Sequence, residues 1–525
     1  MSSLFSAIFV EGRDSQFAVL YGQREITYGE LREATIRTAE ALYALGLEEG
    51  DRVAILLNDS PEFIASFVAI QSLGAIAVPI NMGLRLDEQL VILNDCTAST
   101  AIIEADLCHT LLTDARERLR DLRNVLVVGR DRNSRVGEIG GLNPWLLDDV
   151  PRALLATNFP VSPTDATPAF ILYTSGSTGD AKGAVHRQAD VFHTNETFCK
   201  EVLRLRSGDR LFSSSRLPFA YGLGNSFSFP LLNGATTILC REKPTPEVIS
   251  RILTEHEPTI FFGVPVVYKL LLDHHRRVNA LDCSSLRLCI SAGEALPAHL
   301  GEEWEKTFGV EVLDGIGSTE TLHMWMSNHE GEVRYGSSGT LLRGYEARLL
   351  DEHGNATPVG TEGNLWVRGD SAALGYWERP DLTARTFVDG WVRTGDLYRT
   401  DADGYWCHMG RSDDCFKSSG QWVSPVEVEG VLLRCPGVAR AAVVEDFDQD
   451  GLPCACAFVV REDVNSDAAE LEEELRQLAK AALLPRFKRP RKYLFVTELP
   501  YTATGKVQRF KLRERLRDKR TAAAD

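Results

Sequence analysis

Residues 173–183 combine glycines with hydroxyl side chains in a way that suits the binding of phosphate. Three glycines and four Ser or Thr residues lie here, directly after an apolar strand expected over residues 168–172. Backbone N–H groups of such a loop can wrap phosphate oxygens, whereas the alternative, a flexible linker, seldom lies against a buried strand. Lys182 is followed by Gly183 rather than by Ser or Thr, so the segment differs from the common nucleotide-triphosphatase loop. The predicted phosphate loop comprises Thr174, Ser175, Gly176, Ser177, Thr178, Gly179 and Lys182.

Four more short motifs follow, each with a carboxylate, a hydroxyl or a cationic side chain. They occupy residues 314–320 (Asp-Gly-Ile-Gly-Ser-Thr-Glu), 394–397 (Thr-Gly-Asp-Leu), 410–414 (Gly-Arg-Ser-Asp-Asp) and 504–509 (Thr-Gly-Lys-Val-Gln-Arg). With the phosphate loop, and in this order, they make the sequence closely resemble the adenylate-forming superfamily of acyl-CoA synthetases, luciferases and adenylation domains. The resemblance spans nearly the whole chain. It implies an enzyme that joins a carboxylate to the AMP part of ATP, releases pyrophosphate and passes the acyl group to a thiol.

The resemblance implies a role for each polar residue of these motifs. It places the Thr319 hydroxyl on a phosphate and the Glu320 carboxylate on Mg²⁺, which binds hard oxygen ligands together with substrate phosphates. Asp314 would contact the adenine amino group. Asp396 and Arg411 would bind the ribose hydroxyls, for which a carboxylate acceptor and a planar fork of donors are suited. A surface ion pair is the alternative for these last two residues.

A less specific segment, residues 291–297, falls where the family packs backbone against the face of the adenine. The predicted nucleotide site therefore includes Gly293, Glu294 and Ala295, together with Gly315 and Ile316 from the motif at 314–320. A glycine has no side chain, so Gly293 would allow close approach of the base. A simple strand-to-helix turn, with Glu294 near the start of a helix, is an alternative that stays open.

The last motif contributes a catalytic cation by the same resemblance. Lys506 would meet the carboxylate and the α-phosphate during adenylation and stabilise the charge that develops there. The alternative is a solvated lysine in a basic tail, because residues 506–520 contain eight Lys or Arg and two acidic residues.

The second half-reaction has its own candidates. Asp413 matches the hinge position about which the family's small domain turns. Lys417 would be presented to the site after that rotation and is a further catalytic candidate. The residues implied for binding coenzyme A are Ser419, Gly420 and Trp422.

The type of carboxylic acid is indicated by residues 218–225, where Tyr221 replaces the His of many superfamily members. With Leu322-His323 and the stretch 499–511, this segment resembles the benzoate-CoA ligase branch. Small residues would leave a flat slot between the apolar walls of Tyr221 and Ile316, which favours a planar ring over a fatty chain. His323 would offer a polar edge, although a structural role for a buried His stays open. The predicted substrate pocket consists of Ala220, Tyr221, Gly222, Gly317, His323 and Met324.

Composition and charge exclude several other functions. The chain has 525 residues, which exceeds one ordinary domain, and a formal net charge of −17, which argues against a nucleic-acid partner or an anionic membrane surface. The most apolar window, residues 61–80, contains Glu62, Gln71 and Pro79 and reads as a buried helix followed by a strand, so no transmembrane segment is expected. Residues 1–10 have no basic segment and no clear cleavage site, so no secretory signal is expected. Eleven dispersed cysteines without CxxC pairs fit reduced thiols. We expect a cytoplasmic protein.

The elements that must position these residues alternate between helix and strand. Thr27 and Glu30 form a capping-box pattern before a helix that ends at Gly46, and a strand follows at residues 53–57. The same alternation recurs at residues 63–80, which favours an α/β fold with parallel strands. The predicted large N-terminal domain, residues 1–411, has parallel-rich sheets with helices and binds ATP and the carboxylate. The predicted small, mobile α+β domain, residues 412–525, has strands at 439–444 and 454–460, a helix at 468–484 and a basic tail.

The sequence thus predicts an AMP-forming aryl-CoA ligase that uses ATP, Mg²⁺ and coenzyme A. Its substrate would be benzoate or a substituted benzoate such as 2-aminobenzoate or hydroxybenzoate. One alternative is a free-standing adenylation enzyme that loads an aryl acid onto a carrier protein; a fused carrier is not expected, because only sixteen residues follow Arg509. Another is an inactive ligand-binding homologue, which should lack Lys506, Glu320 or Lys182. A carrier protein or acyltransferase acting downstream, and a monomer or homodimer, are left open.

Overall fold

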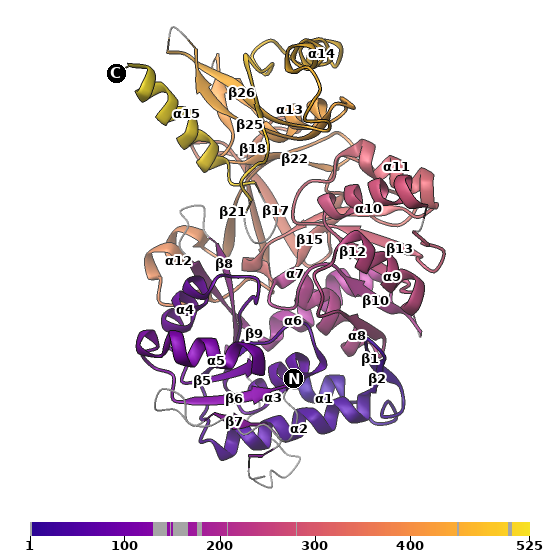
Figure 1. Cartoon of the computed structure of the whole chain (residues 1–525), viewed down its shortest axis with the longest axis vertical. Coiled ribbons are helices and arrows are strands. Elements are labelled where there is room, and N and C mark those ends of the chain that lie inside the picture. Colours follow the sequence, from indigo (N-terminus) through magenta and orange to yellow (C-terminus); the bar gives the residue numbers. More distant parts are fainter. Residues whose placement is uncertain are drawn as a thin grey trace.

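The structure is a computed structural model that describes residues 3–129, 144–147, 149–150, 166–175, 181–206, 208–279, 281–419, 421–448, 451–501 and 507–524. The chain forms two large mixed sheets, a smaller third sheet and a C-terminal α+β part (Figure 1). The C-terminal elements lie at one end of the molecule and the N-terminal ones at the other. The predicted α/β class, with a large N-terminal part and a smaller C-terminal part, is confirmed.

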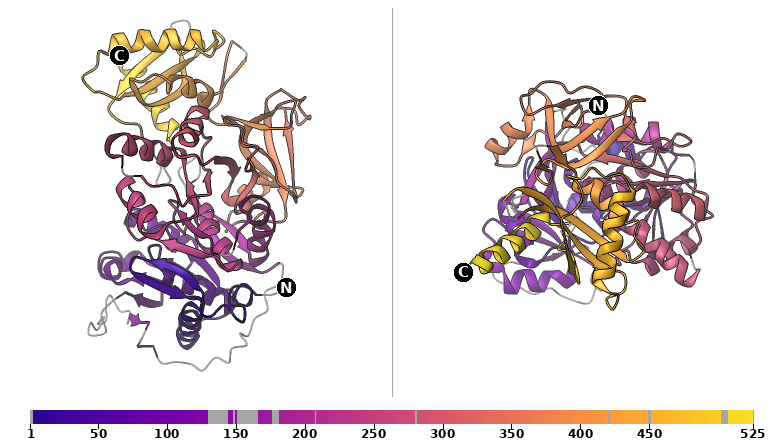
Figure 2. Two further views of the ribbon diagram at one scale, coloured as in Figure 1. Left: turned by 90° about the vertical axis from the view of Figure 1, so that its right-hand side faces the viewer. Right: turned by 90° about the horizontal axis from the view of Figure 1, so that it is seen from above.

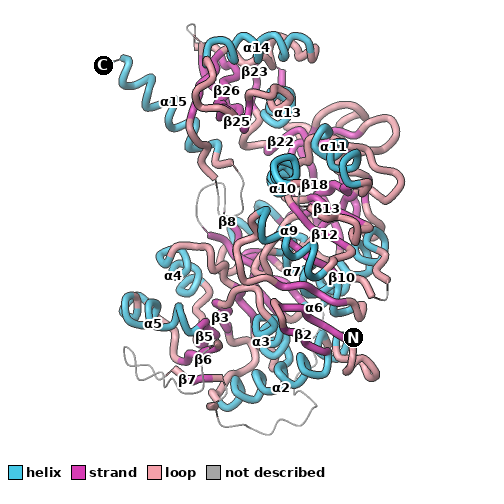
Figure 3. The backbone as a smooth tube through the Cα atoms, turned by 45° about the vertical axis from the view of Figure 1, so that its right-hand side comes forward, coloured by secondary structure: helices cyan, strands magenta, loops and turns pink. Residues whose placement is uncertain are grey.

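The first large sheet has a parallel centre and an antiparallel hairpin at one edge. Its strand order is β19-β9-β8-β4-β3-β5-β6-β7, and the pairs between β8 and β7 are parallel. Helices pack their apolar sides on the strands, and Figure 3 shows two of them, α4 and α5, on the outside of this sheet. The strands are β3 (Arg52–Leu56), β4 (Ile76–Pro79), β5 (Thr100–Glu104), β6 (Asn124–Val128), β7 (Trp145–Leu146), β8 (Pro168–Ser175), β9 (Ala181–Arg187) and β19 (Gly375–Tyr376). The helices are α2 (Tyr28–Ala44), α4 (Leu86–Asp95) and α5 (Ala105–Asp114).

The second large sheet repeats this plan, with antiparallel strands at both edges. Its order is β16-β15-β14-β13-β12-β10-β11-β1-β2, and the pairs from β14 to β1 are parallel. The strands are β1 (Phe17–Tyr21), β2 (Arg24–Thr27), β10 (Arg210–Ser213), β11 (Thr236–Leu239), β12 (Ile260–Gly263), β13 (Leu288–Ser291), β14 (Val312–Gly317), β15 (Met324–Ser327) and β16 (Thr340–Leu341). The helices that pack on it are α9 (Pro246–His256), α10 (Pro265–Val278) and α11 (Ala298–Phe308).

Helix α3 (Pro61–Ser72) lies inside the core that the two large sheets share. The predicted buried helix and following strand at 61–80 are confirmed as α3 and β4, and Glu62 is the one residue of α3 that is not buried. The ring of Phe67 lies 5.4 Å from that of Phe170 on β8 and 5.2 Å from that of Phe227, which belongs to a π-helical segment, Gly224–Ser228. Because side chains of β3, β8, β1 and β11 join the same cluster, α3 helps to fix one sheet against the other.

The short helices around this segment complete the core. α7 (Ala220–Leu223) precedes the π-helical segment and α8 (Phe229–Leu232) follows it. α1 (Leu4–Ile8) packs on α3 and α8, and α6 (Gln188–Thr194) continues into a second π-helical segment, Asn195–Leu203.

The third sheet and the C-terminal part follow β16. The side view in Figure 2 shows the third sheet, in orange, on one side of the molecule and the C-terminal part, in yellow, above it. The third sheet contains β17 (Tyr345–Leu350), β18 (Gly363–Gly369), β20 (Phe387–Val388), β21 (Trp391–Thr400) and β22 (Trp406–Arg411), with α12 (Pro380–Thr386) beside it. The C-terminal part contains the hairpin β23 (Phe416–Ser418) and β24 (Gln421–Val423), the sheet of β25 (Val438–Phe447), β26 (Pro453–Arg461) and β27 (Lys492–Val496), and the helices α13 (Pro425–Leu432), α14 (Ala468–Ala481) and α15 (Arg509–Ala524).

The ends of the helices show where the sequence patterns were sufficient to predict the start or end of a helix. The capping box is confirmed, since the Thr27 N–H donates to Glu30 Oε2 at 2.8 Å and the Glu30 N–H donates to Thr27 Oγ1 at 3.2 Å. The predicted helix at 468–484 ends earlier, at Ala481. The basic tail forms helix α15, which the charge pattern did not reveal. Leu512 and Leu516 bury one turn of this helix against β25 and β26 and so stabilise it there.

Two further features of the described residues concern their helices and their cysteines. None of their helices has the length and apolar character that crossing a membrane requires. All eleven cysteines are free thiols, and nine of them are buried.

The packing of α3 leads to a prediction about stability. Phe67→Ala should lower the stability of the large N-terminal part by about 3–5 kcal/mol, because it removes a fully buried ring and leaves a cavity between the sheets. Thermal and denaturant unfolding of the large part measure the change. Val359→Ala is the control, because Val359 is 68% exposed and should shift the transition by less than about 0.5 kcal/mol. Equal shifts for the two variants would contradict the role of α3.

Candidate active site

The two large sheets meet at a contact between Lys182 and Glu320. Lys182 lies on β9 of the first sheet, and Glu320 lies on a 3₁₀ turn, Thr319–Thr321, directly after β14 of the second. Lys182 Nζ is 3.1 Å from Glu320 Oε1 and donates to the Tyr376 hydroxyl at 2.6 Å, and this hydroxyl donates to Glu320 Oε1 at 2.6 Å. Tyr376, on β19, was not predicted. It is 194 residues from Lys182, and only the pairing of β19 with β9 brings the two together.

The surroundings of Glu320 favour its ionised form. Burial by itself would raise the pKa of the carboxyl, but the Lys182 ammonium and the Tyr376 hydroxyl outweigh this effect and lower the pKa. An ionised carboxylate beside Lys182 fits Mg²⁺, which commonly takes one or two carboxylates together with substrate phosphates. Among the described residues no group of three or more His, Cys, Asp or Glu side chains gathers into a metal site.

The predicted phosphate loop joins two paired strands. Thr174 lies opposite Lys182 and Ser175 opposite Ala181 in the β8–β9 hairpin. Gly176, Ser177, Thr178 and Gly179 lie outside the described residues. The preceding residue, Tyr173, donates its hydroxyl to Asp95 Oδ2 at 2.6 Å, which fastens the root of the loop to the end of α4.

Asp314 lies where an adenine amino group could be recognised. It is buried on β14, directly opposite Ser291 at the end of β13, and its Oδ2 accepts the Leu296 N–H at 3.2 Å. Its Oδ1 makes no hydrogen bond with the described residues. Burial raises the pKa of the Asp314 carboxyl well above its usual range. A buried oxygen without a partner fits a ligand N–H group. The exposed Gly293 and Glu294 and the half-buried Ala295 directly precede Leu296, whose N–H binds Asp314.

The two residues predicted for the ribose face each other across a strand pair. Asp396 on β21 and Arg411 on β22 are register partners, and Arg411 Nη1 lies 3.2 Å from Asp396 Oδ1. Burial would lower the pKa of Arg411, but Asp396 outweighs it and raises the pKa. His408 Nε2, which was not predicted, is 3.5 Å from Asp396 Oδ1. The sequence separates these groups by 12 to 15 residues, and the hairpin brings them together.

The predicted substrate residues Tyr221 and His323 lie within an aromatic cluster. The ring of His323 is 5.6 Å from that of Tyr221, 4.8 Å from that of Phe198 and 4.7 Å from that of Phe229. Burial lowers the pKa of His323 to about 3, so the ring is neutral. Its Nε2 lies 3.1 Å from Asn225 Oδ1, while His323 Nδ1 and Asn225 Nδ2 make no hydrogen bond with the described residues. The cluster therefore offers one unused polar atom on each of two buried side chains.

The small residues of the predicted pocket lie close to backbone. A Cβ atom added to Gly222 would lie 2.0 Å from the Arg216 carbonyl oxygen, and one added to Gly317 would lie 2.6 Å from the His323 carbonyl oxygen. Gly224, which was not predicted, makes room for His323, since a Cβ there would lie 2.5 Å from the ring. Ala220 is buried in the core that includes α3, and Met324 is buried beside Gly315. Ile316 is half-buried and packs against the hydrophobic cluster that contains Met324.

The predicted site residues of the C-terminal part lie in two segments, residues 413–422 and the loop that carries Lys506. Lys417 Nζ lies 2.7 Å from Glu352 Oε1 and 4.9 Å from the centre of the Trp422 ring, so the structure does not bring it to Glu320. Ser419 is exposed on the same hairpin, whereas Gly420 lies outside the described residues. Asp413 is exposed directly after β22.

Lys506 also lies outside the described residues, but the flanks of its loop are described. Tyr501 and Val507 pair across the loop as an isolated bridge. Arg509 Nη2 donates to the two carboxylate oxygens of Glu429 at 3.0 and 2.8 Å, and its Nε donates to Glu429 Oε1 at 3.2 Å. Its Nη1 lies 3.4 Å from Asp414 Oδ2. These contacts fix Arg509, just after the loop, next to Asp414, which follows the predicted hinge residue Asp413.

Comparison with known families agrees with this geometry. A family model described as AMP-binding enzyme matches residues 9–377, and one described as AMP-binding enzyme C-terminal domain matches residues 427–506. The chain belongs to the AMP-binding enzyme family, and the predicted superfamily is confirmed.

Individual relatives are similar over almost their full lengths. The benzoate-CoA ligase of Thauera aromatica is 40% identical over 96% of this chain and 93% of its own. The anthranilate-CoA ligase of Pseudomonas aeruginosa is 34% identical over 98% of this chain and 96% of its own. A crystal structure of an anthranilate-CoA ligase in complex with anthranoyl-AMP superposes with a TM-score of 0.89 at 36% identity, covering 98% of this chain and 97% of the other. The predicted resemblance to the benzoate-CoA ligase branch is confirmed.

The contact between Tyr376 and Glu320 predicts a change in pH dependence. Tyr376→Phe removes a hydroxyl that lowers the pKa of Glu320, so the pKa should rise and the acidic limb of kcat/KM should move to higher pH. The rate loss should therefore grow as the pH falls, measured as pyrophosphate release between pH 5 and pH 9. Tyr335→Phe is the control, because its hydroxyl donates to Glu305 at 2.8 Å on a remote helix. An unmoved acidic limb would show that the hydroxyl does not act on Glu320.

Proposed function

We propose that the protein is an AMP-forming aryl-CoA ligase. It activates benzoate or a substituted benzoate with ATP to give an aryl-adenylate and pyrophosphate, and the thiol of coenzyme A then displaces AMP to give the thioester. One observation carries the proposal: Glu320, which contacts Lys182, and His323, which lies inside the aromatic cluster, are only three residues apart in the chain. A carboxyl group activated next to Glu320 would place its ring among Tyr221, Phe198 and Phe229. The aromatic acids in the names of the relatives support this choice.

The chemistry requires activation because a carboxylate has no good leaving group. Attack of a carboxylate oxygen on the α-phosphorus forms a mixed anhydride and breaks the bond to pyrophosphate. AMP then leaves readily when the thiol attacks the acyl carbon. Enclosure of the adenylate keeps water from hydrolysing it.

The residues of the large part have binding and orienting roles in this proposal. Lys182 and Thr319 bind phosphate oxygens together with the loop 174–179, and Glu320 holds Mg²⁺. The metal, when bound, neutralises charge on the phosphates. Asp314 receives the adenine amino group, and the Asp396–Arg411 pair binds the ribose. Tyr221 and His323 line the ring, and Gly293, Glu294, Ala295, Gly315 and Ile316 border the base.

The C-terminal part provides one residue set for each half-reaction. We place the domain boundary between residues 411 and 412 and the hinge at Asp413. Lys506 serves adenylation. The position of Arg509 supports this assignment, because the charge of Glu294, in the adenine loop, contributes to raising the pKa of Arg509. Lys417, Ser419, Gly420 and Trp422 serve the second step after the hinge turns. The free thiols support a reducing, cytoplasmic location.

The experiment that tests the function is a substrate panel. Pyrophosphate release is measured with Mg-ATP and benzoate, 2-aminobenzoate, hydroxybenzoates, cyclohexanecarboxylate or a medium-chain fatty acid, each with and without coenzyme A. We expect a signal that is confined to ring acids and stimulated by coenzyme A. Release that coenzyme A does not accelerate would indicate a carrier protein as the acceptor. Absence of release with every acid would contradict the proposed function.

Two substitutions should separate the half-reactions. Lys506→Ala should abolish pyrophosphate release and spare thioester formation from supplied aryl-adenylate, because its charge acts during attack on phosphorus. Gly420→Leu should retain adenylate formation and lose transfer to coenzyme A, because a side chain would block the path of the thiol. Single-turnover assays of each step measure both effects. Equal loss of both steps in either variant would contradict the division of labour.

A further inference from the structure

The turn that carries Glu320 is held from outside by three donors. The carbonyl oxygens of Thr319, Glu320 and Thr321 each accept a hydrogen bond from a residue far away in the sequence. His186 Nε2 lies 2.7 Å from the first, the Ala373 N–H donates to the second at 2.8 Å, and the Ser371 hydroxyl donates to the third at 2.8 Å. Three consecutive carbonyls fixed in this way leave the turn little freedom, so the direction of the Glu320 side chain depends on these donors.

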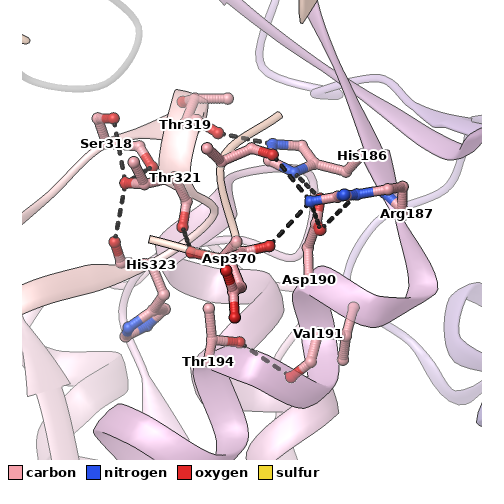
Figure 4. Close-up of polar contacts among 12 residues, drawn as sticks. His186, Arg187, Asp190, Val191, Thr194, Ser318, Thr319, Thr321, His323 and Asp370 are labelled. Atoms are coloured by element: carbon pink, nitrogen blue, oxygen red, sulfur yellow. Dashed lines mark hydrogen bonds and ion pairs between the residues drawn. The ribbon is translucent and has the colours of Figure 1, made fainter. Parts of the chain in front are cut away.

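His186 is the most enclosed of the three donors. Its side chain is fully buried at the end of β9, and its ring stacks on that of Phe170 at 5.2 Å. Its other nitrogen, Nδ1, lies 2.8 Å from Asp190 Oδ2, and Asp190 is fully buried as well. A backbone carbonyl cannot donate, so Nε2 must carry a proton. Figure 4 shows the ring between the Thr319 backbone and the Asp190 carboxylate.

Arg187 links this pair to the segment that holds the rest of the turn. Arg187 Nε donates to Asp190 Oδ1 at 2.9 Å, and its Nη2 donates to the carbonyl oxygens of Asp370 at 2.8 Å and Ala372 at 3.1 Å. The segment 370–373 supplies the other two donors to the turn. One buried carboxylate, Asp190, therefore connects all three hydrogen bonds, as Figure 4 shows for the side chains around it.

We propose that His186, with Asp190 and Arg187, is a positioning group that sets the direction of the Glu320 carboxylate toward its metal. The inference rests on the proposed role of Glu320 as the Mg²⁺ ligand. None of the three residues touches the reacting atoms, since His186 acts on the backbone of Thr319 and Arg187 acts through residues 370–372. His186 and Arg187 lie on β9, the strand that carries Lys182, so the network sets the phosphate-binding cation and the metal-binding carboxylate together.

The decisive variant is His186→Gln, whose single amide cannot replace both ring nitrogens, which lie against Asp190 Oδ2 and the Thr319 carbonyl, and which loses the stack on Phe170. Binding of Mn²⁺ as a probe, in the presence of an unreactive ATP analogue, is followed by electron paramagnetic resonance. We expect binding to weaken about 10–100-fold, as is common when a group behind a metal ligand is removed. Adenylate formation should fall in parallel, with the loss reduced by excess metal, while thioester formation from supplied aryl-adenylate is unchanged. His275→Gln is the control. The His275 ring, on α10, packs on Phe308 of α11, away from the site.

Two further variants separate the possible failures. Glu320→Gln should itself abolish the binding of Mn²⁺ at this site. If this variant binds Mn²⁺ normally, the proposed role of Glu320 is wrong. If Glu320→Gln loses the metal and His186→Gln keeps normal affinity, the positioning inference is overturned. Arg187→Lys covers the case in which His186→Gln does not fold, because Arg187 is partly exposed and Lys cannot reach both carbonyls. Normal metal affinity in Arg187→Lys would then overturn the inference, and a weaker affinity would support it.

Discussion

The ion pair between Lys182 and Glu320 is the contact on which the rest of the site depends. One charge belongs to the hairpin of the first sheet and the other to the turn after β14 of the second, so the pair exists only when both sheets have formed and packed. Both side chains are largely buried, and a buried charge that loses its partner is strongly destabilising. The fold therefore places opposite charges at a junction that also has to receive phosphates and a metal.

Much of the site could be predicted from short motifs because each motif keeps its residues on one element. Asp314, Thr319 and Glu320 follow one strand, and the structure keeps them on that strand and its turn. Asp396 and Arg411 come from separate motifs, and the hairpin of β21 and β22 makes them register partners. The alternation of helix and strand was enough for the class of fold, since parallel strands covered by helices have nearly continuous apolar sequences.

Other parts could not be predicted, since they depend on register and on distant packing. Tyr376 reaches Glu320 only through the pairing of β19 with β9, and His186 reaches the Thr319 carbonyl across 133 residues. Gly224 is required by the ring of His323, which no local pattern reveals. Helix α15 was read as a basic tail because two buried leucines among many charges give a weak periodic signal.

The surface contact between Lys417 and Glu352 has a consequence for how the C-terminal part is held. Both side chains are about half exposed, and one belongs to the hairpin after β22 while the other belongs to the turn between β17 and β18. Attraction between exposed charges is weak and is screened further as ionic strength rises. The proposed rotation about Asp413 would have to break this contact, so in that proposal the ionic composition of the surroundings becomes one of the variables that set how readily the enzyme changes shape.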